Sequence, residues 1–417
     1  MLLIKPEKLG NECIHRDTLR GAVTSALHGM LILTGFATAG ALMTSCKPRP
    51  APSSAEHPAE QAIVKGNTLL VGEVSSMTGS EATFGVSTHQ GIQLAFQQIN
   101  AAGGVQGKKL ELVTLDDQSK PEEAATAATK LISQNQVIAV LGEVASSRSI
   151  AMAPIAQNSR TPMISPSSTN PRVTEMGNYI FRVCFIDPFQ GEVMSKFTLN
   201  DLKLKKVAIL RDVDSDYSNG LADYFKASFK KGGGNIVIDQ SYSSSDIDFK
   251  SQLTAIRAKK PDAILVPGYY TAVGLIARQA RELGIKVPLL GGDGWDSPKL
   301  LEIGGKALEG AYFSNHYSNE DTSPRIQSFV TQFKDRYGVK PDGMAAMGYD
   351  AAMILADALK RSKTLSKEDL RNAIADTHDF AAVTGMITLN EKRNAIKPAV
   401  ILKIVNGAFQ YRTSVQP

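Results

Sequence analysis

From residue 68 onward, short apolar runs alternate with stretches whose apolar residues recur at helical spacing. The first run covers residues 69–74, and the stretch after it carries Ile92, Ala95, Phe96 and Ile99. Short apolar runs between turn residues are typical of buried strands, and the i, i+3, i+4, i+7 spacing is typical of a helix with one apolar face. The same pattern predicts further strands at 110–115, 137–141, 163–164, 207–210, 236–238, 263–266 and 287–290, mostly separated by helices.

Repeated strand–helix units of this kind predict parallel sheets with helices on both faces. One series ends near residue 185 and a second begins near residue 187, so we expect two α/β lobes. Helices are predicted at about 322–337, 343–360 and 366–376, followed by one strand at 400–405. These late helices have too few strands to form a lobe of their own, and we expect them to cover the first lobe. Pro154 lies inside the third predicted helix and should kink or shorten it.

Two hydroxyl-rich turns follow the neighbouring strands at 137–141 and 163–164. The first turn contains Ser146 and Ser147, and the second contains Ser167, Ser168 and Thr169. Ligands of open parallel sheets bind beyond the carboxyl ends of the strands. Hydroxyls, backbone N–H groups and a helix N-terminus at that edge suit a carboxylate or another small anion. The turns therefore predict a binding site, with ordinary surface loops as the alternative interpretation.

In the second series, polar and aromatic residues also follow strand ends. Tyr269 comes directly after the strand at 263–266, where an aromatic ring can form the wall of a crevice. Asp293 lies between glycines after the strand at 287–290, and its carboxylate is suited to pair with an ammonium group. A turn-stabilising aspartate is the alternative interpretation for Asp293.

Composition excludes several classes of function. The chain has 417 residues, which favours two or three domains, and its net charge of +5 is spread without a basic stripe among aromatics. Nucleic acid is therefore not an expected partner. The HExxH, CxxC, GxSxG and Walker patterns are absent, and the six histidines have no metal-ligand spacing, so we expect no enzyme, cofactor or metal site. Asp116 and Asp117 are interpreted as helix-capping residues, with a metal or acid pair as the alternative.

The N-terminus predicts export from the cytoplasm. Arg16 and Arg20 precede an apolar, small-residue run at 21–43, which is typical of a secretory signal. Cys46 follows this run as the lipidated cysteine does in bacterial lipoproteins, so residues 1–45 are predicted to be a lipoprotein signal peptide. A plain signal peptide or a transmembrane anchor is the alternative. Residues 46–67 are rich in proline and polar residues and are predicted to be a flexible tether.

The order and spacing of these motifs resemble the periplasmic leucine/isoleucine/valine-type binding proteins, a type I fold that supplies ABC importers with branched-chain amino acids. The resemblance begins at Thr68 and extends almost to the C-terminus. The motifs that carry the resemblance lie at residues 77–79 with 84–85, 99–107, 116–117, 146–147, 164–169, 216–220, 268–269 and 291–294.

The resemblance implies an α/β fold of two Rossmann-like lobes joined by three crossover segments near 185, 315 and 380. Lobe 1 would contain residues 68–185 and 316–380. Lobe 2 would contain residues 186–315 and 381–417.

It also implies a role for each site residue. Ser146 and Thr169 match donors to the α-carboxylate of an amino acid, in the same turns as Ser168. The carbonyl of Ser167 and the hydroxyl of Thr169 match acceptors for its α-ammonium group, and Asp293 matches an acidic residue that pairs with this group from the second lobe. Tyr217 and Tyr269 match aromatics that close over the ligand. Phe84 stands where tyrosine is frequent, and Trp295 lies near the side-chain end of the pocket.

The function implied is that of an extracytoplasmic receptor, anchored to the membrane only through lipid. It would capture a zwitterion, of the branched-chain amino-acid type, by hinged closure of its lobes and deliver it to an ABC permease as a monomer. One alternative is a sensory or regulatory binding protein for an amide, a urea or an aromatic acid. Another is an extracellular α/β enzyme that uses Ser146 or Asp293.

Overall fold

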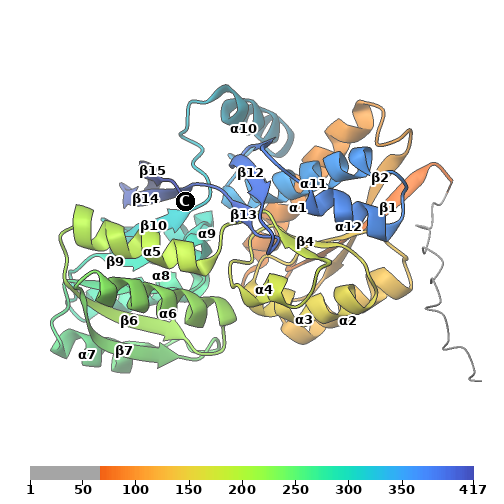
Figure 1. Ribbon diagram of the computed structural model, residues 1–417. Helices are drawn as coiled ribbons and strands as arrows, with labels where there is room; N and C mark the ends of the chain where they lie inside the picture. Colours follow the sequence, from red (N-terminus) through yellow and green to blue (C-terminus); the bar gives the residue numbers. More distant parts are fainter. Residues whose placement is uncertain (1–65) are drawn as a thin grey trace, which may run out of the picture. The chain divides into compact units, whose positions relative to one another are not determined.

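The computed structural model describes residues 66–417 (Figure 1). The predicted signal peptide, Cys46 and the tether up to residue 65 lie outside the described residues. Within the described part, the strands form a five-stranded sheet, a seven-stranded sheet and a small three-stranded sheet. None of the helices described there is both long and apolar enough to cross a membrane.

The five-stranded sheet is the centre of lobe 1. All of its neighbouring strands are parallel, as the strand–helix pattern predicted. Two buried apolar clusters cover its two faces, one involving α1 and the other involving α2 and α3. In sheet order the strands are β2 (Lys109–Asp116), β1 (Thr68–Ser75), β3 (Val140–Leu141), β4 (Met163–Ser165) and β5 (Ile180–Arg182), and the helices are α1 (Ala82–Ala101), α2 (Pro121–Ser133), α3 (Ser146–Asn158) and α4 (Arg172–Glu175).

The late helices return to lobe 1, which confirms that prediction. They are α10 (Pro324–Tyr337), α11 (Gly343–Arg361) and α12 (Lys367–Ala375), and Figure 1 shows α11 and α12 in blue beside the orange α1. The backbones of α1 and α11 approach each other closely at two glycines. A Cβ atom at Gly348 would lie 2.4 Å from the carbonyl oxygen of Thr88, and one at Gly91 would lie 2.0 Å from that of Ala345.

The seven-stranded sheet is the centre of lobe 2. Its strands from β10 to β7 are parallel, and the hairpin of β14 and β15 adds an antiparallel edge beside β10. In sheet order they are β15 (Ala408–Val415), β14 (Ala399–Val405), β10 (Tyr312–Asn315), β9 (Leu289–Gly291), β8 (Ala263–Leu265), β6 (Lys206–Asp212) and β7 (Asn235–Tyr242). The helices are α5 (Asp187–Lys196), which a π-helical turn at Phe197–Asp201 extends, α6 (Asp216–Lys231), α7 (Lys250–Ala258), α8 (Tyr270–Glu282) and α9 (Pro298–Gly304), with 3-10 turns at Asp293–Trp295 and Gly305–Leu308.

The third crossover lies later in the chain than residue 380, so that predicted boundary was wrong. The small sheet of β11 (Phe380–Ala382), β12 (Gly385–Leu389) and β13 (Ala395–Ile396) buries Ile387 and Leu389 in the main core of lobe 1. The chain enters lobe 2 only after this sheet, where β14 begins at Ala399. The first two crossovers lie near 185 and 315 as expected, since β5 belongs to the first sheet and β10 to the second.

Pro154 does not shorten α3, which continues through it to Asn158. The buried residues Met152, Ala153 and Ala156 pack this helix against the sheet of lobe 1. Because burial of an apolar helix face stabilises the helix more than one backbone hydrogen bond does, the missing N–H of Pro154 is tolerated.

Candidate ligand-binding site

The predicted site residues of both lobes come together where the two sheets face each other. Ser146 begins α3, and the turn of Ser167 to Thr169 follows β4, so both belong to the carboxyl edge of the first sheet. Asp293 follows β9 at the corresponding edge of the second sheet. The Ser167 hydroxyl lies 3.5 Å from Oδ2 of Asp293, which makes a direct contact between the lobes. All these residues are buried, so the lobes are closed over the site.

The hydroxyl groups of lobe 1 differ in how they are used. Ser146 Oγ accepts the backbone N–H of Asn170 at 3.2 Å and keeps its own proton available. Thr169 Oγ1 is buried and has no hydrogen-bond partner of normal geometry. Ser168 Oγ lies 2.9 Å from the carbonyl oxygens of Glu143 and Val144, so it holds the turn together and faces the protein interior. Ser146 and Thr169 are therefore the hydroxyls best placed to bind a ligand.

Asp293 is held by neutral hydrogen-bond donors. Gln190 Nε2 donates to its Oδ1 at 2.8 Å, and His316 Nε2 lies 3.1 Å from its Oδ2. Burial lowers the pKa of His316 to about 4, so the imidazole is neutral at pH 7 and donates its Nε2 proton. No lysine or arginine of the described residues forms an ion pair with Asp293. This buried carboxylate thus lacks a cationic partner, which an ammonium group would supply.

Asp187 is a second carboxyl group in the same region that the sequence analysis missed. It is the first residue of α5, directly after the first crossover, and both of its carboxyl oxygens are buried without a partner of normal geometry. Burial and the nearby charge of Asp293 raise its pKa to about 8, although the Thr169 hydroxyl and Arg182 oppose this shift. Gln190 and His316 were missed as well. All three flank the predicted crossovers, and that position was the available signal.

Three aromatic rings form one wall of the site. Tyr217 and Tyr269 of lobe 2 stack with their centroids 5.2 Å apart, and Phe84 of lobe 1 meets Tyr269 edge-on at 5.8 Å. The Tyr217 hydroxyl also accepts the backbone N–H of Gly294 at 3.1 Å, which ties this wall to the turn of Asp293. Trp295 is completely buried in the core of lobe 2, where its indole N–H donates to the carbonyl oxygen of Val266 at 3.0 Å.

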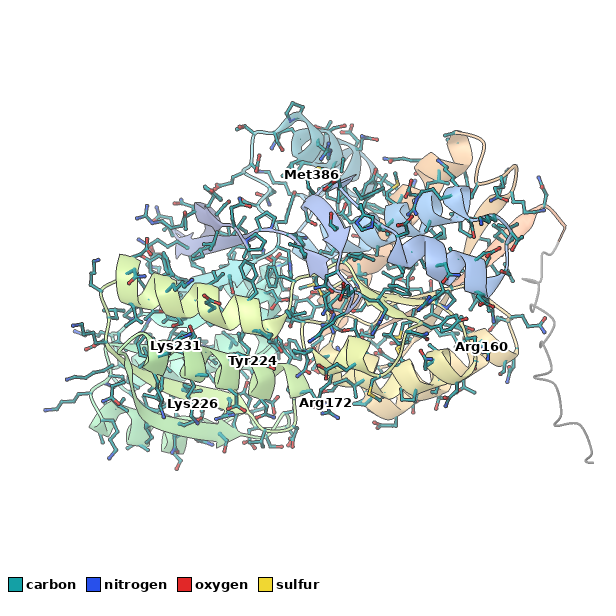
Figure 2. The ribbon with its side chains drawn as sticks, in the orientation of Figure 1. Arg160, Arg172, Tyr224, Lys226, Lys231 and Met386 are labelled. Carbon is teal, nitrogen blue, oxygen red and sulfur yellow. The ribbon has the colours of Figure 1, made fainter. Side chains whose placement is uncertain are left out.

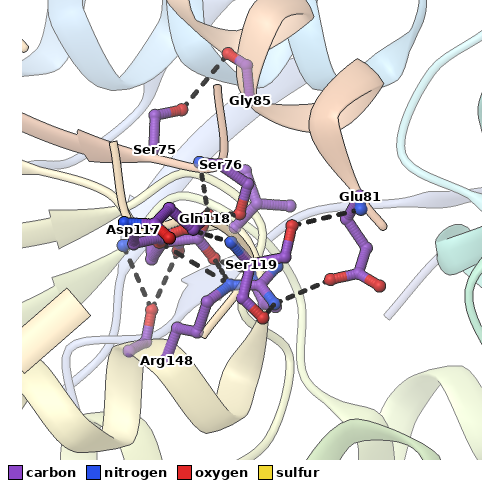
Figure 3. A network of polar contacts seen from close by, with 12 residues as sticks. Ser75, Ser76, Glu81, Gly85, Asp117, Gln118, Ser119 and Arg148 are labelled. Atoms are coloured by element: carbon purple, nitrogen blue, oxygen red, sulfur yellow. Dashed lines mark hydrogen bonds and ion pairs between the residues drawn. The ribbon is translucent and has the colours of Figure 1, made fainter. Parts of the chain in front are cut away.

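A buried ionic network supports the binding turn of lobe 1 (Figure 3). Arg148, two residues after Ser146, donates to Glu143 at 3.0 Å and to Glu81 at 2.8 Å. Although burial lowers the pKa of Arg148, its neighbours Glu143 and Glu81 raise it further, so the guanidinium stays charged. The network joins the ends of β1, β2 and β3 to the start of α3. It therefore positions Ser146.

The interpretation of Asp116 and Asp117 as helix-capping residues was wrong. Lys120 is the N-cap of α2, and no side chain caps that helix end. Asp116 instead accepts the backbone N–H of Met77 at 3.0 Å, and Asp117 accepts the Ser76 hydroxyl at 2.7 Å. Both carboxylates hold the loop after β1. Among residues 66–417, no cluster of three or more His, Cys, Asp or Glu side chains is arranged to bind a metal ion.

A separate pocket of about 610 Å³ lies beside the site, between the start of α1 and α9. Thr83, Ser87, Pro298 and Leu301 line it, and none of the predicted site residues does. Its walls are mainly apolar and it lacks the hydroxyl donors of the two binding turns. The convergent polar groups around Asp293 are therefore the stronger candidate for a ligand site.

Comparisons with known proteins show which family the fold belongs to. The sequence profile described as "Periplasmic binding protein" matches residues 68–408. The Leu/Ile/Val-binding protein BraC3 of Rhizobium johnstonii is 29% identical over 325 residues, which is 78% of this chain and 88% of the relative. The crystal structure of the leucine-binding protein LivK from Thermotoga maritima has 40% identity and a TM-score of 0.81, covering 84% of this chain and 99% of that one. LivJ of Streptococcus pneumoniae, solved in complex with isoleucine, has 35% identity and a TM-score of 0.80, with 84% and 100% covered.

Proposed function

The chain belongs to the periplasmic binding protein family, and from this premise we propose that it captures an amino acid of the branched-chain type outside the cytoplasm and presents it to an ABC importer. Relatives whose names state leucine, isoleucine and valine binding, and a similar structure with isoleucine bound, support this choice of ligand.

The observation that carries the proposal is the buried Asp293 carboxylate, which has only neutral donors as partners. An α-ammonium group beside it would provide the missing positive charge. Ser146 and Thr169 lie on the opposite lobe, where their hydroxyls suit the α-carboxylate of the same ligand. A zwitterion would thus be held at its two charged ends by different lobes, and its binding would favour the closed state.

The membrane context is part of the proposal. A lipid on Cys46 and the tether up to residue 67 would keep the receptor near its permease. Phe84 and the tyrosine pair would influence which amino-acid side chain is preferred, while Trp295 would act only by supporting the turn of Asp293 from the core of lobe 2. We propose action as a monomer, with the permease as the protein partner.

The test is a thermal-shift panel on protein that has been unfolded and refolded to remove carried-over ligand. L-leucine, L-isoleucine and L-valine should raise the melting temperature, whereas an aliphatic amide and benzoate should not. A ligand at 100 times its dissociation constant adds about 2.7 kcal/mol to the free energy of unfolding. Stabilisation by the amide or benzoate alone would refute the amino-acid assignment.

The variant Asp293→Ala tests the ammonium contact. Removing one partner of a buried charged pair costs about 2–5 kcal/mol, so L-leucine binding measured by calorimetry should weaken roughly 30-fold or more. Asp201→Ala removes an exposed carboxylate from the same lobe and should leave the affinity unchanged. A change below about threefold in Asp293→Ala would mean that the ammonium pairs elsewhere.

A further inference from the structure

We infer that Asp216 is the residue that holds the closed lobes together beside the ligand, and that its contacts set how long the ligand stays bound. This inference rests on the proposed function, because it assigns a role in the closure of the same site. Asp216 is the first residue of α6 in lobe 2, directly before Tyr217.

Besides the intrahelical bonds of α6, Asp216 makes three hydrogen bonds, and all three go to lobe 1. Its backbone N–H donates to the Ser147 hydroxyl at 2.9 Å, and its backbone carbonyl accepts from Asn170 Nδ2 at 2.8 Å. Its carboxylate pairs with the Arg172 guanidinium at 2.7 Å. Figure 2 shows Arg172 where lobe 1 meets α6. A single residue of lobe 2 is therefore held by three separate residues of lobe 1.

These contacts are continuous with the ligand site. The backbone N–H of Asn170 donates to Ser146 Oγ, the hydroxyl proposed to bind the carboxylate, and its side chain holds Asp216. Asn170 Oδ1 also accepts the backbone N–H of Arg172 at 3.0 Å, so the same residue orients the ion pair. A ligand that orders Ser146 consequently orders the groups that hold Asp216.

The three bonds contribute unequally to the stability of the closed state. The side chains of Arg172 and Asp216 are 59% and 33% exposed, and an ion pair so exposed contributes little. The bonds of the backbone N–H and carbonyl are better shielded, since Asn170 is buried and Ser147 and Asp216 are partly buried. Opening the lobes would transfer those two backbone groups to water. We therefore assign most of the effect to the backbone bonds and less to the charge.

The other end of the cleft is closed by hydroxyl contacts of a different kind. Thr83 Oγ1 lies 2.8 Å from Ser297 Oγ, and Thr271 Oγ1 donates to the carbonyl of Ser80 at 2.8 Å. These contacts involve only uncharged groups and spread over four residues. At Asp216, by contrast, one substitution removes an ion pair and a backbone hydrogen bond between the lobes at once.

The variant Asp216→Pro tests the inference with little effect on the helix itself. Proline is favoured at the first position of a helix, and Ser215 has the extended conformation (φ −103°, ψ 117°) that a residue before proline requires. The Ser215 hydroxyl still accepts the backbone N–H of Ser218 and so caps the start of α6. Asp216→Pro thus loses the N–H bond and the ion pair together, and its ring Cδ takes the place of the proton that faces Ser147 Oγ. Circular dichroism checks that the fold is kept, and Ser147→Ala tests the N–H bond without the added ring.

Stopped-flow fluorescence of Trp295, the only tryptophan of the chain, gives the association and dissociation rates of L-leucine. We expect Asp216→Pro to raise the dissociation rate roughly 5- to 30-fold and to change the association rate less than about threefold, since contacts made after encounter act on dissociation. Ser147→Ala, which removes only the acceptor of the N–H bond, should raise the dissociation rate roughly 2- to 10-fold. Asp216→Asn keeps both backbone bonds and should change it less than about threefold.

Glu192→Ala is the matched control, because Glu192 is exposed and its ion pair is with Lys196 within α5 of lobe 2. Its rates should equal those of the wild type. If Asp216→Pro and Ser147→Ala both release L-leucine at the wild-type rate, the inference is wrong. Equal effects of Asp216→Asn and Asp216→Pro would refute the assignment to the backbone bonds.

Small-angle scattering of the ligand-free protein separates this inference from the proposed function. Losing interlobe contacts should shift Asp216→Pro toward open lobes and increase its radius of gyration relative to the wild type, whether or not L-leucine is the ligand. If no amino acid binds but the variant opens, the proposed ligand is wrong and the role of Asp216 stands. An unchanged radius in both Asp216→Pro and Ser147→Ala, together with wild-type dissociation rates in both, overturns the role of Asp216.

Discussion

At the scale of single residues, the site contains buried carboxyl groups that have no cationic partner among residues 66–417. Asp187 and Asp293 are both buried, and the donors in hydrogen-bond contact with Asp293 are Gln190, Ser167 and the neutral His316. A neutral histidine fixes the orientation of the carboxylate without cancelling its charge. The attraction between the site and an ammonium group is thereby preserved.

Asp187 should make ligand affinity depend on pH. Burial raises its pKa to about 8, and an ammonium group nearby favours the deprotonated form, so binding should release a proton below pH 8. We predict that the affinity for L-leucine rises from pH 6 to pH 8, by at most about tenfold per pH unit for one released proton. Calorimetry in phosphate and Tris buffers measures this proton directly. Asp187→Asn should remove the dependence, and an unchanged slope in that variant would exclude Asp187 as the group that titrates.

The sequence revealed the residues that follow regular strands and missed those that follow crossovers. Ser146, Thr169 and Asp293 were predicted as site residues because each follows an apolar run, and the sheet itself fixes the position of its strand ends. Asp187 and His316 lie in segments that change lobes, and such segments have no hydrophobic period that reveals their partners. The direction of the Trp295 side chain was likewise set by packing in lobe 2, which sequence spacing alone does not show.

At the scale of elements, the contact of α1 with α11 explains how residues 260 positions apart, Thr88 and Gly348, build one lobe. Thr88 of α1 and Gly348 of α11 meet where the absence of a side chain lets the backbones touch. The start of α1 carries Phe84, and the start of α11 lies against the turn of Asp296, whose carboxylate accepts the N–H of Gly343 at 2.6 Å. The packing of these two helices therefore fixes the positions of Phe84 and of the turn of Asp296 beside the cleft.

Gly348→Ala should destabilise the protein. Its new methyl group would lie 2.4 Å from the carbonyl oxygen of Thr88, so the two helices must separate. Overpacking of this kind costs about 1–3 kcal/mol in the free energy of unfolding, which urea denaturation measures. Lys360→Ala, an exposed position at the end of the same helix, should stay within about 0.5 kcal/mol of the wild type. Equal stability of Gly348→Ala and the wild type would show that the helices adjust without cost.

Helices were predicted more completely than strands, for a physical reason. Each late helix carries several turns of a 3.6-residue pattern, and their predicted limits agree with α10, α11 and α12 to within two residues. The strands β5 and β10 have only three and four residues and were not predicted. Length alone does not explain this, because β4, β8 and β9 are equally short and were predicted from their apolar runs. The second half of β10 is polar, at Ser314 and Asn315, and pairing with neighbouring strands decides its conformation.

At the scale of the whole molecule, the two-lobe architecture was predictable because the strand–helix pattern restarts once. The third crossover was misplaced because the residues after α12 form a small antiparallel sheet on lobe 1. That sheet is fastened by Asp350 of α11, which accepts the backbone N–H groups of Val383 and Thr384 at 2.7 and 2.9 Å. Lys397, also buried, donates to the Thr384 hydroxyl just before the chain leaves for lobe 2. These contacts join residues that are far apart in the sequence, so no local pattern of apolar residues predicts them.

Buried carboxyl groups in both lobes should also make the stability of the molecule fall with rising pH. Burial and the neighbouring Glu143 raise the pKa of Asp117 in lobe 1 to about 7, and burial and Asp342 raise that of Asp296 in lobe 2 to about 7. Unfolding returns both groups to a pKa near 3.8, so between pH 4 and 7 the folded protein binds more protons than the unfolded chain. Each carboxyl therefore lowers the free energy of unfolding as the pH rises through this window.

Two other buried groups raise the free energy of unfolding as the pH rises, but in other pH windows. The pKa of His316 falls from 6.5 to about 4 on folding, so its effect is confined to pH values below 6.5. The pKa of Lys397 falls from 10.5 to about 8, so its effect appears only above pH 8. We accordingly predict that the urea-measured free energy of unfolding falls from pH 6.5 to pH 7.5 at constant ionic strength, most steeply below pH 7. Asp117→Asn keeps an oxygen acceptor for Ser76 and should reduce this slope. A stability that does not fall over the same interval would mean that these carboxyl groups are already ionised in the folded protein. Asp117, which lies 3.7 Å from Arg148 Nε, would then join Glu81 and Glu143 as a third negative charge beside that guanidinium.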